Sequence, residues 1–346
     1  MPTLLHLTGG TEHLALEFST HANSPLLLLA HNSHNSLPAA LETLARLRSD
    51  GRRAWLVTEE NAANLSLFAH VVRIARELRG KKLGLIGDFS PWLVASSPDP
   101  SVLRTKLGVD VVPIPLEELR KRIPKRPDVL PEGKGTGVGE EERGMAGRIY
   151  AALRRIVAEE KLAAFSLACF ALICEGFTAC WALARLADEG IPSGCEGDLP
   201  GLLALWVSQI LTGKPGFLAN PVETDQKRER VLLAHCTVPF SLTDDFSLCT
   251  HFESGIGLAV AGRVKPGPYT LVRFGGKALE KAFIVEGNVL PEHPGREDLC
   301  RTQVWLKMPK GAIRKLLEEP LGNHHVLIPG HHHQILRLFH TVFLSD

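Results

Sequence analysis

The sequence GCEGDLP at residues 194–200 follows an apolar part of the chain and places an acidic residue, Glu196, at a predicted turn before a helix. Two other polar residues, Asn220 and His235, come at the ends of short apolar runs at 214–218 and 231–234. In an open α/β sheet, ligands bind beyond the carboxyl ends of the strands. We therefore expect Glu196, Asn220 and His235 to converge on one crevice.

These three side chains have a chemistry suited to metal binding. A carboxylate, an amide and an imidazole form a hard oxygen and nitrogen set that suits Mn²⁺, Mg²⁺ or a related divalent ion such as Co²⁺. The pair His324 and His325 supplies another candidate ligand just before an apolar strand at 326–328. The alternative interpretation is three strand ends with ordinary polar caps.

The first part of the chain alternates strand and helix patterns. Apolar runs at 26–30, 54–57 and 83–86 predict strands, and helical spacing of apolar residues predicts helices at 38–50 and 62–79. This alternation is typical of βαβ units in a parallel sheet.

A segment rich in proline and glycine, 124–139, predicts a linker or mobile loop. The pattern of a second α/β unit follows it, with helices at 144–160, 178–188 and 199–211 and a strand at 165–173. From residue 231 onward, short strands separated by glycine and proline turns predict a β-rich domain. The predicted fold class is α/β, with Rossmann-like domains at 1–124 and 125–222 and a barrel-like β domain at 223–346.

Composition narrows the class of protein. A net charge of +1 over 346 residues, without a Lys/Arg-rich tract, argues against general nucleic-acid binding. The seven cysteines lack the paired spacing of a zinc site and are interpreted as reduced core residues. The apolar segment 162–186 contains charged residues and fits a buried strand and helix better than a membrane span. No secretory signal pattern follows Met1, so we expect a cytoplasmic protein that does not bind a membrane.

Several short motifs resemble those of the L-fucose/L-arabinose isomerase family. They are Cys-Glu-Gly-Asp at 195–198, Ala-Asn-Pro at 219–221, Ala-His-Cys at 234–236, Thr-His-Phe-Glu-Ser-Gly-Ile-Gly at 250–257 and Gly-Asn-His-His at 322–325, with weaker matches at 35–42, 84–87 and 91–93. The resemblance runs from about residue 25 to near the C-terminus and is strongest over 191–325. The chain resembles a short, divergent branch that lacks part of the usual N-terminal region.

The resemblance implies aldose–ketose isomerisation of an open-chain sugar through an enediolate. In that chemistry a divalent metal, with Mn²⁺ the first choice, acts as a Lewis acid on O1 and O2, while carboxylates move the proton. The family's active site is often completed by a neighbouring subunit, so a homo-oligomer is also expected.

Carried over by position, the family's metal ligands fall on Glu196, Asn220, His235 and the pair His324 and His325. His325 is slightly preferred within the pair. Consecutive strand residues point to opposite faces, so we expect only one of the two to reach the metal. Asn220 stands where the family has an acidic residue. An amide oxygen can coordinate a cation but cannot accept a proton as a carboxylate does.

The missing carboxylate has three candidate replacements: Asp198, Glu175 and Glu253. Asp198 alternatively caps the helix that begins at residue 199, and the other two are alternatively loop residues with local partners. His251 resembles a family motif position that contacts substrate and is alternatively a buried structural histidine. The alternative functions are a catalytically altered relative that binds a carbohydrate-like ligand for regulation or scaffolding, and an epimerase or lyase with the same metal site.

Overall fold

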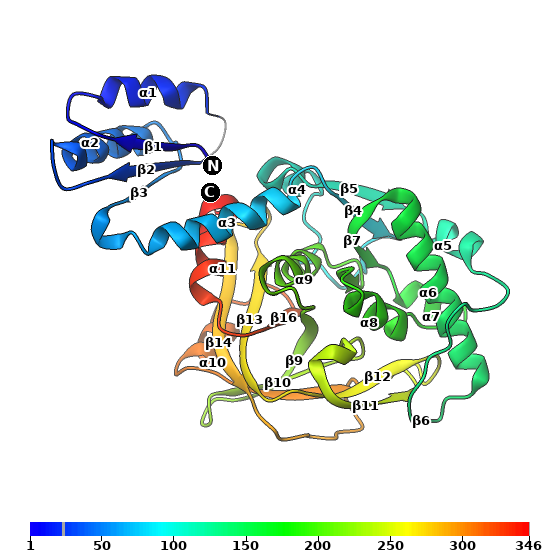
Figure 1. The fold of residues 1–346 in the computed structure, drawn as a ribbon. Coiled ribbons are helices and arrows are strands. Elements are labelled where there is room, and N and C mark those ends of the chain that lie inside the picture. The colour runs from blue at the N-terminus through cyan, green and yellow to red at the C-terminus, as the bar shows by residue number, and fades with distance from the viewer. Residues whose placement is uncertain (23–24, 346) are drawn as a thin grey trace. The chain divides into compact units, whose positions relative to one another are not determined.

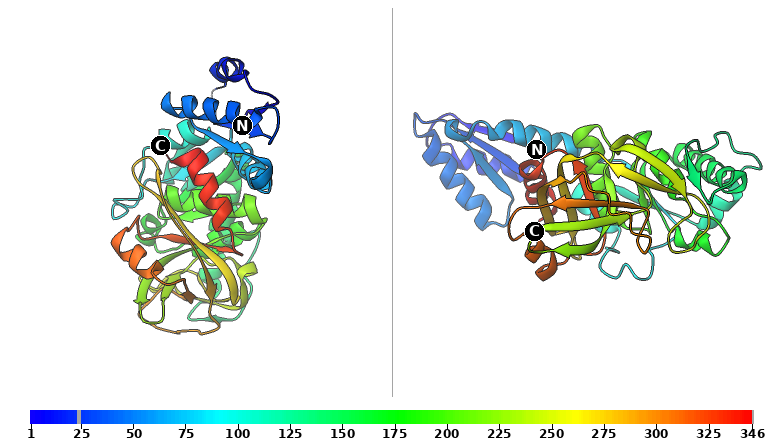
Figure 2. Two further views of the ribbon diagram at one scale, coloured as in Figure 1. Left: turned by 90° about the vertical axis from the view of Figure 1, so that its left-hand side faces the viewer. Right: turned by 90° about the horizontal axis from the view of Figure 1, so that it is seen from below.

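The computed structural model describes residues 1–22 and 25–345, which form two compact units. The first unit comprises Met1–Arg76 with Gln334–Ser345, and the second comprises residues 77–333 (Figures 1 and 2). The expected division into three domains at 124 and 222 stays a prediction from the sequence.

The first unit is built on a parallel sheet of strand order β1-β2-β3, formed by β1 (Thr3–His6), β2 (Leu26–Ala30) and β3 (Ala54–Val57). The helices are α1 (Glu12–Thr20), α2 (Ser36–Ser49), α3 (Asn64–Leu78) and the C-terminal α11 (His333–Phe339), the last two running across the boundary between the units. Leucines of β2 and α2 form the core, which includes Leu26, Leu28, Leu44 and Leu47. The βαβ alternation expected here is confirmed, with β1 and α1 as elements that the sequence pattern did not reveal.

The second unit contains a parallel sheet of strand order β5-β4-β7-β8. Its strands are β4 (Lys82–Ile86), β5 (Asp110–Ile114), β7 (Leu162–Leu167) and β8 (Ser193–Cys195). The accompanying helices are α4 (Ser101–Leu107), α5 (Leu116–Arg122), α6 (Glu140–Glu160), α8 (Cys180–Asp188) and α9 (Leu199–Thr212). The strand expected at 165–173 ends at Leu167, because Phe170–Ile173 forms the short helix α7. A short apolar run fits a buried strand and a buried helix equally well, which explains this error.

Six antiparallel strands form a closed barrel in the same unit (Figure 1). They are β9 (Phe217–Asp225), β10 (Arg230–His235), β13 (Gly267–Gly275), β14 (Lys281–Val289), β15 (Thr302–Lys307) and β16 (His325–Pro329). Their order around the barrel is β10-β15-β14-β13-β16-β9, and β9 pairs with β10 to close it. A β-rich C-terminal part was expected and is present. Its first strand begins at Phe217, so the expected domain boundary at 222 lies inside β9.

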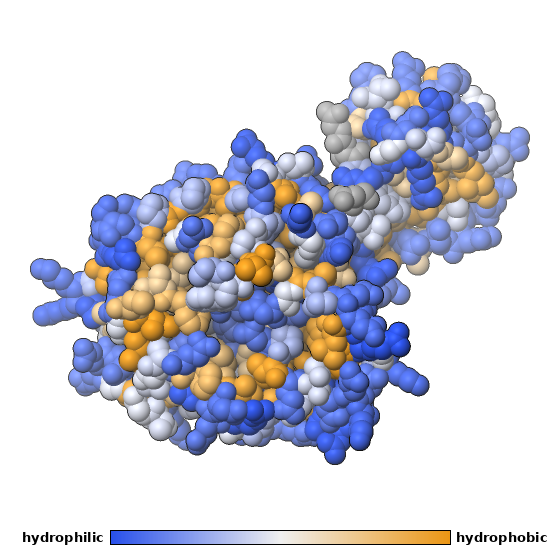
Figure 3. Space-filling view, turned by 180° about the vertical axis from the view of Figure 1, so that it is seen from behind, coloured by the Kyte–Doolittle hydropathy of each residue, from blue (hydrophilic) through white to orange (hydrophobic). Residues whose placement is uncertain are grey.

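A small sheet of order β12-β11-β6 completes the unit, with β11 (Thr243–Cys249), β12 (Ala259–Val264) and β6 (Gly135–Thr136). Part of the segment expected as a linker at 124–139 is therefore a strand. The helix α10 (Ala312–Glu318) precedes β16. Among the described residues, no helix is long and apolar enough to cross a bilayer. On the face shown in Figure 3, hydrophilic side chains surround separate groups of hydrophobic ones.

Candidate functional site

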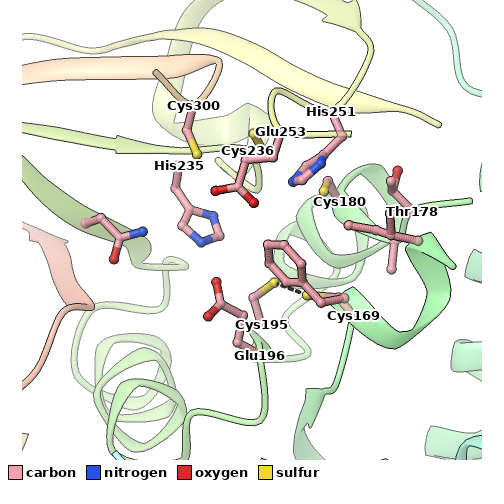
Figure 4. Close-up of a pocket in the computed structure, with 14 residues that line it drawn as sticks. Cys169, Thr178, Cys180, Cys195, Glu196, His235, Cys236, His251, Glu253 and Cys300 are labelled. Carbon is pink, nitrogen blue, oxygen red and sulfur yellow. Dashed lines mark hydrogen bonds between the residues drawn. The ribbon is translucent and has the colours of Figure 1, made fainter. Parts of the chain in front are cut away.

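A pocket in the second unit gathers residues from the parallel sheet and from the barrel (Figure 4). Glu196 follows β8, Asn220 lies within β9 and His235 ends β10. The loop after β11 adds His251 and Glu253. The expected convergence is present, but its physical reason was wrong. Only Glu196 comes from the end of a parallel strand, and the antiparallel barrel supplies the other side of the pocket.

The backbone at Glu196 has an unusual conformation. Its φ of 62° is in the left-handed region, which a residue with a side chain adopts at a cost of about 1–3 kcal/mol. The next residue, Gly197, has a φ of 76° and leaves no room for a side chain, because a Cβ there would lie 2.7 Å from the carbonyl oxygen of Asp88. The Glu196 carbonyl oxygen also accepts a hydrogen bond from the Ser90 N–H at 3.0 Å. This turn holds the acidic residue in one orientation.

The Glu196 carboxylate has defined partners. Trp92 Nε1 donates a hydrogen bond to Oε2 at 2.6 Å, and His324 Nε2 lies 3.4 Å from Oε1. The Trp92 ring packs edge-on against Phe170 with a centroid separation of 4.9 Å, and Phe170 in turn packs against His251 at 5.8 Å. An aromatic group therefore adjoins one side of the pocket.

Two histidines are oriented toward Glu196 by bonds from their other ring nitrogen. His235 Nδ1 is hydrogen-bonded to Thr237 Oγ1 at 2.9 Å, which leaves Nε2 available to the pocket. His324 Nδ1 is hydrogen-bonded to Asp198 Oδ2 at 3.0 Å, and the His324 and His235 rings lie 5.3 Å apart. Such support fixes both the tautomer and the orientation of an imidazole.

The preference for His325 within the pair is corrected by the geometry. His325 is the first residue of β16, its Nδ1 is bonded to the Asn323 carbonyl oxygen and its ring packs on Phe283 at 5.5 Å. His324 is the histidine beside Glu196. Only one of the two faces the site, as strand alternation predicted, but it is the other one.

Burial and neighbouring charges set the protonation of these groups. Burial opposes ionisation of Glu196, but His324 and the Trp92 hydrogen bond outweigh it and lower the pKa of the carboxyl group. Burial, followed by the charge of His324, lowers the pKa of His235 to about 3. Burial would also lower the pKa of His324, yet the carboxylates of Asp198 and Glu196 raise it to about 9. The site thus combines an ionised Glu196 with a neutral His235 and a positively charged His324.

Asp198 has a structural position and does not line the pocket. Its Oδ1 accepts a hydrogen bond from the Gly201 N–H at 2.8 Å, so it caps α9. Its Oδ2 forms a fully buried ion pair with Arg273 Nη1 at 2.7 Å. Burial opposes ionisation, but Arg273 and His324 lower the pKa of Asp198 to about 2. Asp198 is therefore not placed to replace the missing carboxylate, because both of its oxygens are bound within the protein and it does not line the pocket.

The other candidate carboxylates differ in position. Glu175 forms an ion pair with Arg120 at 2.5 Å and does not line the pocket. Glu253 lines the pocket near His251, and burial together with the charge of Glu196 raises the pKa of its carboxyl group. Of the three candidates, Glu253 is the one that lines the pocket.

Sequence reasoning missed several residues of the site. Trp92 lies in the motif at 91–93 that resembles the isomerase family, but its hydrogen bond to Glu196 was not foreseen. The thiol of Cys195 lies with Glu196 and His235, in a group whose ligand atoms are all within 4.8 Å of one another. The interpretation of the cysteines as core residues correctly gave the burial of Cys195 but did not foresee its place in the pocket.

Comparison with known proteins gives similarity to one group of enzymes. The chain is 24% identical to a sulfoquinovose isomerase of Alkalicoccus urumqiensis over 280 residues, covering 76% of this chain and 63% of that protein. It is 24% identical to a sulfoquinovose isomerase of Priestia aryabhattai, covering 59% of this chain and 49% of that protein. It is 28% identical to a sulfoquinovose isomerase of Clostridium sp. (strain MSTE9), covering 48% of this chain and 39% of that protein.

The sequence identity to these sugar isomerases is low, at 24–28%. The chain spans about half the length of the curated relatives it matches. No protein-family model matches the sequence.

Proposed function

We propose that this protein is an aldose–ketose isomerase acting on an open-chain sugar, with sulfoquinovose or a related sugar as the first candidate substrate. The observation that carries the proposal is the convergence of Glu196 and His235 in one pocket, within a chain similar to sulfoquinovose isomerases. The cytoplasmic location and the homo-oligomer stay predictions from the sequence.

The donor set supports a divalent metal in this pocket. Glu196 and His235 would hold the ion, and Asn220 and His324 are adjacent candidates. Asn220 Oδ1 is buried and makes no hydrogen bond within the described part of the chain, as expected of an atom that faces a ligand. His324 Nε2 faces Glu196 Oε1 at 3.4 Å and would bind the ion only after losing its proton. A bound divalent ion would supply Lewis-acid polarisation of the sugar's oxygens.

The protein's own groups would position the sugar and move the proton. Aldose–ketose isomerisation through an enediolate moves one proton between C2 and C1 and another between O2 and O1, so a base must accept a proton from one carbon and return it to the other. A carboxylate of the pocket can serve as that base. Glu196, with its lowered pKa, is suited to hold charge, whereas the raised pKa of Glu253 makes it the carboxyl group better suited to accept and return a proton. His251 lies beside Glu253 and would contact the sugar's hydroxyl groups (Figure 4).

One observation favours a second function. By the resemblance of its Ala-Asn-Pro motif, Asn220 stands where the isomerase family has a carboxylate, and an amide cannot transfer the proton. A relative that has lost turnover but still binds a carbohydrate-like ligand is therefore the second candidate.

The two functions are distinguished by assaying aldoses and ketoses, sulfoquinovose included, with added Mn²⁺. An isomerase should lose turnover in Glu196→Gln and keep or gain it in Asn220→Asp, with Glu253→Gln costing about 10²–10⁴-fold. A binding protein should show no turnover, yet a sugar ligand should raise its Tm, because it binds the folded state preferentially. An active wild type unaffected by Glu196→Gln would refute the assignment of this pocket.

A further inference from the structure

The thiol of Cys195 lies beside the functional groups of Glu196 and His235. The ligand atoms of Cys195, Glu196 and His235 lie within 4.8 Å of one another. A point then exists no more than about 2.8 Å from all three (4.8 Å divided by √3). Zinc–ligand distances are about 2.0–2.3 Å, so movements of roughly half an ångström would complete the coordination.

The backbone explains how two consecutive residues reach the same point. Successive side chains of an extended strand point to opposite faces, which would separate Cys195 from Glu196. The left-handed conformation of Glu196, with φ 62°, interrupts that alternation directly after β8. The strained turn therefore adds a sulfur to the oxygen and nitrogen of the site.

Other polar groups around this point support a ligand-binding role. A second thiol, Cys169, lies with its sulfur 2.7 Å from that of Cys195 and also lines the pocket. Asn220 Oδ1, in the same pocket, is buried and has no hydrogen-bond partner among the described residues. Buried polar atoms are nearly always paired, so an unpaired acceptor oxygen in this pocket is consistent with a cation or a ligand donor as its partner.

We propose that the pocket binds a zinc-type divalent ion, Zn²⁺ or Co²⁺, through Cys195 Sγ, His235 and Glu196, rather than the hard Mn²⁺ or Mg²⁺ expected from the sequence. Thiolate and imidazole donors select borderline-soft ions, whereas Mg²⁺ and Mn²⁺ favour all-oxygen or oxygen-rich sites. The inference rests on the metal site of the proposed function and specifies the ion and a ligand.

The test is Co²⁺ spectroscopy of the full-length reduced protein after removal of metals with a chelator. A thiolate bound to Co²⁺ gives an intense sulfur-to-metal charge-transfer absorption in the near ultraviolet, which oxygen and nitrogen ligands do not give. The affinity order alone decides nothing, because most sites bind Co²⁺ and Zn²⁺ more tightly than Mn²⁺. We expect the band in the wild type, its displacement by Zn²⁺, and its loss in Cys195→Ser, with Zn²⁺ affinity reduced on the order of 100-fold.

Cys300→Ser is the matched control, because Cys300 also lines the pocket but is not part of the ligand group. This variant should keep the band. Wild-type protein that binds Co²⁺ without the band, or that binds no Co²⁺, overturns the inference whether or not Cys195→Ser folds. Isomerase activity with Mn²⁺ and no band would refute the sulfur ligand and leave the proposed function standing, whereas the band without turnover on any sugar would do the reverse.

Discussion

Arg273 offers a prediction with a magnitude that follows from its surroundings. Its guanidinium is fully buried, donates to Asp198 Oδ2 at 2.7 Å from Nη1 and to Ser96 Oγ at 2.5 Å from Nη2. Arg273→Met keeps most of the apolar stem and removes the charge. Asp198, also fully buried, would then lose its strongest opposite charge.

Breaking a buried ion pair by removing one partner costs about 3–5 kcal/mol, because the remaining charge is left uncompensated. For a unit of this size, each kcal/mol lowers the Tm by about 2–4 °C, so we expect a loss of about 6–20 °C. The measurement is thermal unfolding followed by circular dichroism at pH 7.

The matched control is Arg314→Met, since Arg314 pairs with Glu318 with side-chain exposures of 77% and 62%. An exposed pair contributes about 0–1 kcal/mol. In the Asp198→Asn background, Arg273→Met should cost less than in the wild type, because no carboxylate remains to be stranded. A Tm loss in Arg273→Met no larger than that in Arg314→Met would show that the buried charges do not interact as the structure indicates.

Three further outcomes are expected. Trp92→Phe keeps an aromatic ring but removes the hydrogen-bond donor to Glu196. If the wild type turns over a sugar, this variant should lower kcat/KM by about 10–100-fold with unchanged Tm. An unchanged kcat/KM would show that Trp92 does not contribute to the site. Gly197→Ala should destabilise the protein more than Gly213→Ala, because both positions have a positive φ but only the first is crowded; equal Tm values would contradict the close approach. The pKa of His324, raised to about 9, stabilises the metal-free protein fully below the unfolded value near 6.5 and loses that contribution as pH rises through 9. The wild-type Tm should therefore fall between pH 6.5 and 9 more steeply than that of His324→Gln, and parallel curves would exclude this linkage.

The sequence predicted those parts of the fold that depend on local pattern. The strands β2 and β3 have the expected bounds, because short apolar runs between turn residues leave few alternatives. The residues 170–173 were assigned to a strand and are a helix, since an apolar run of that length carries no decisive period. Local sequence therefore predicted the positions of buried segments better than it predicted whether each one is a strand or a helix.

The candidate site was predictable in its residue types and only partly in its geometry. Glu196 and His235 were expected together, and the structure brings them together. The choice between His324 and His325 depends on where β16 starts and on its pairing with β9, in which His325 lies opposite Ala219. That register is set by residues about a hundred positions away, so no local pattern contains it.

Asp198 shows why an acidic residue near a site need not act on substrate. One of its oxygens caps α9, and the other pairs with Arg273 and with His324 Nδ1. A substitution at Asp198 would therefore lower activity in three ways at once: by loosening the helix, by stranding the arginine and by freeing the imidazole that faces Glu196. If Asp198→Asn lowers activity while the folded fraction is unchanged, the loss shows that Asp198 positions other groups of the site. This variant separates positioning from folding, because its amide oxygen can still accept the hydrogen bond that caps the helix.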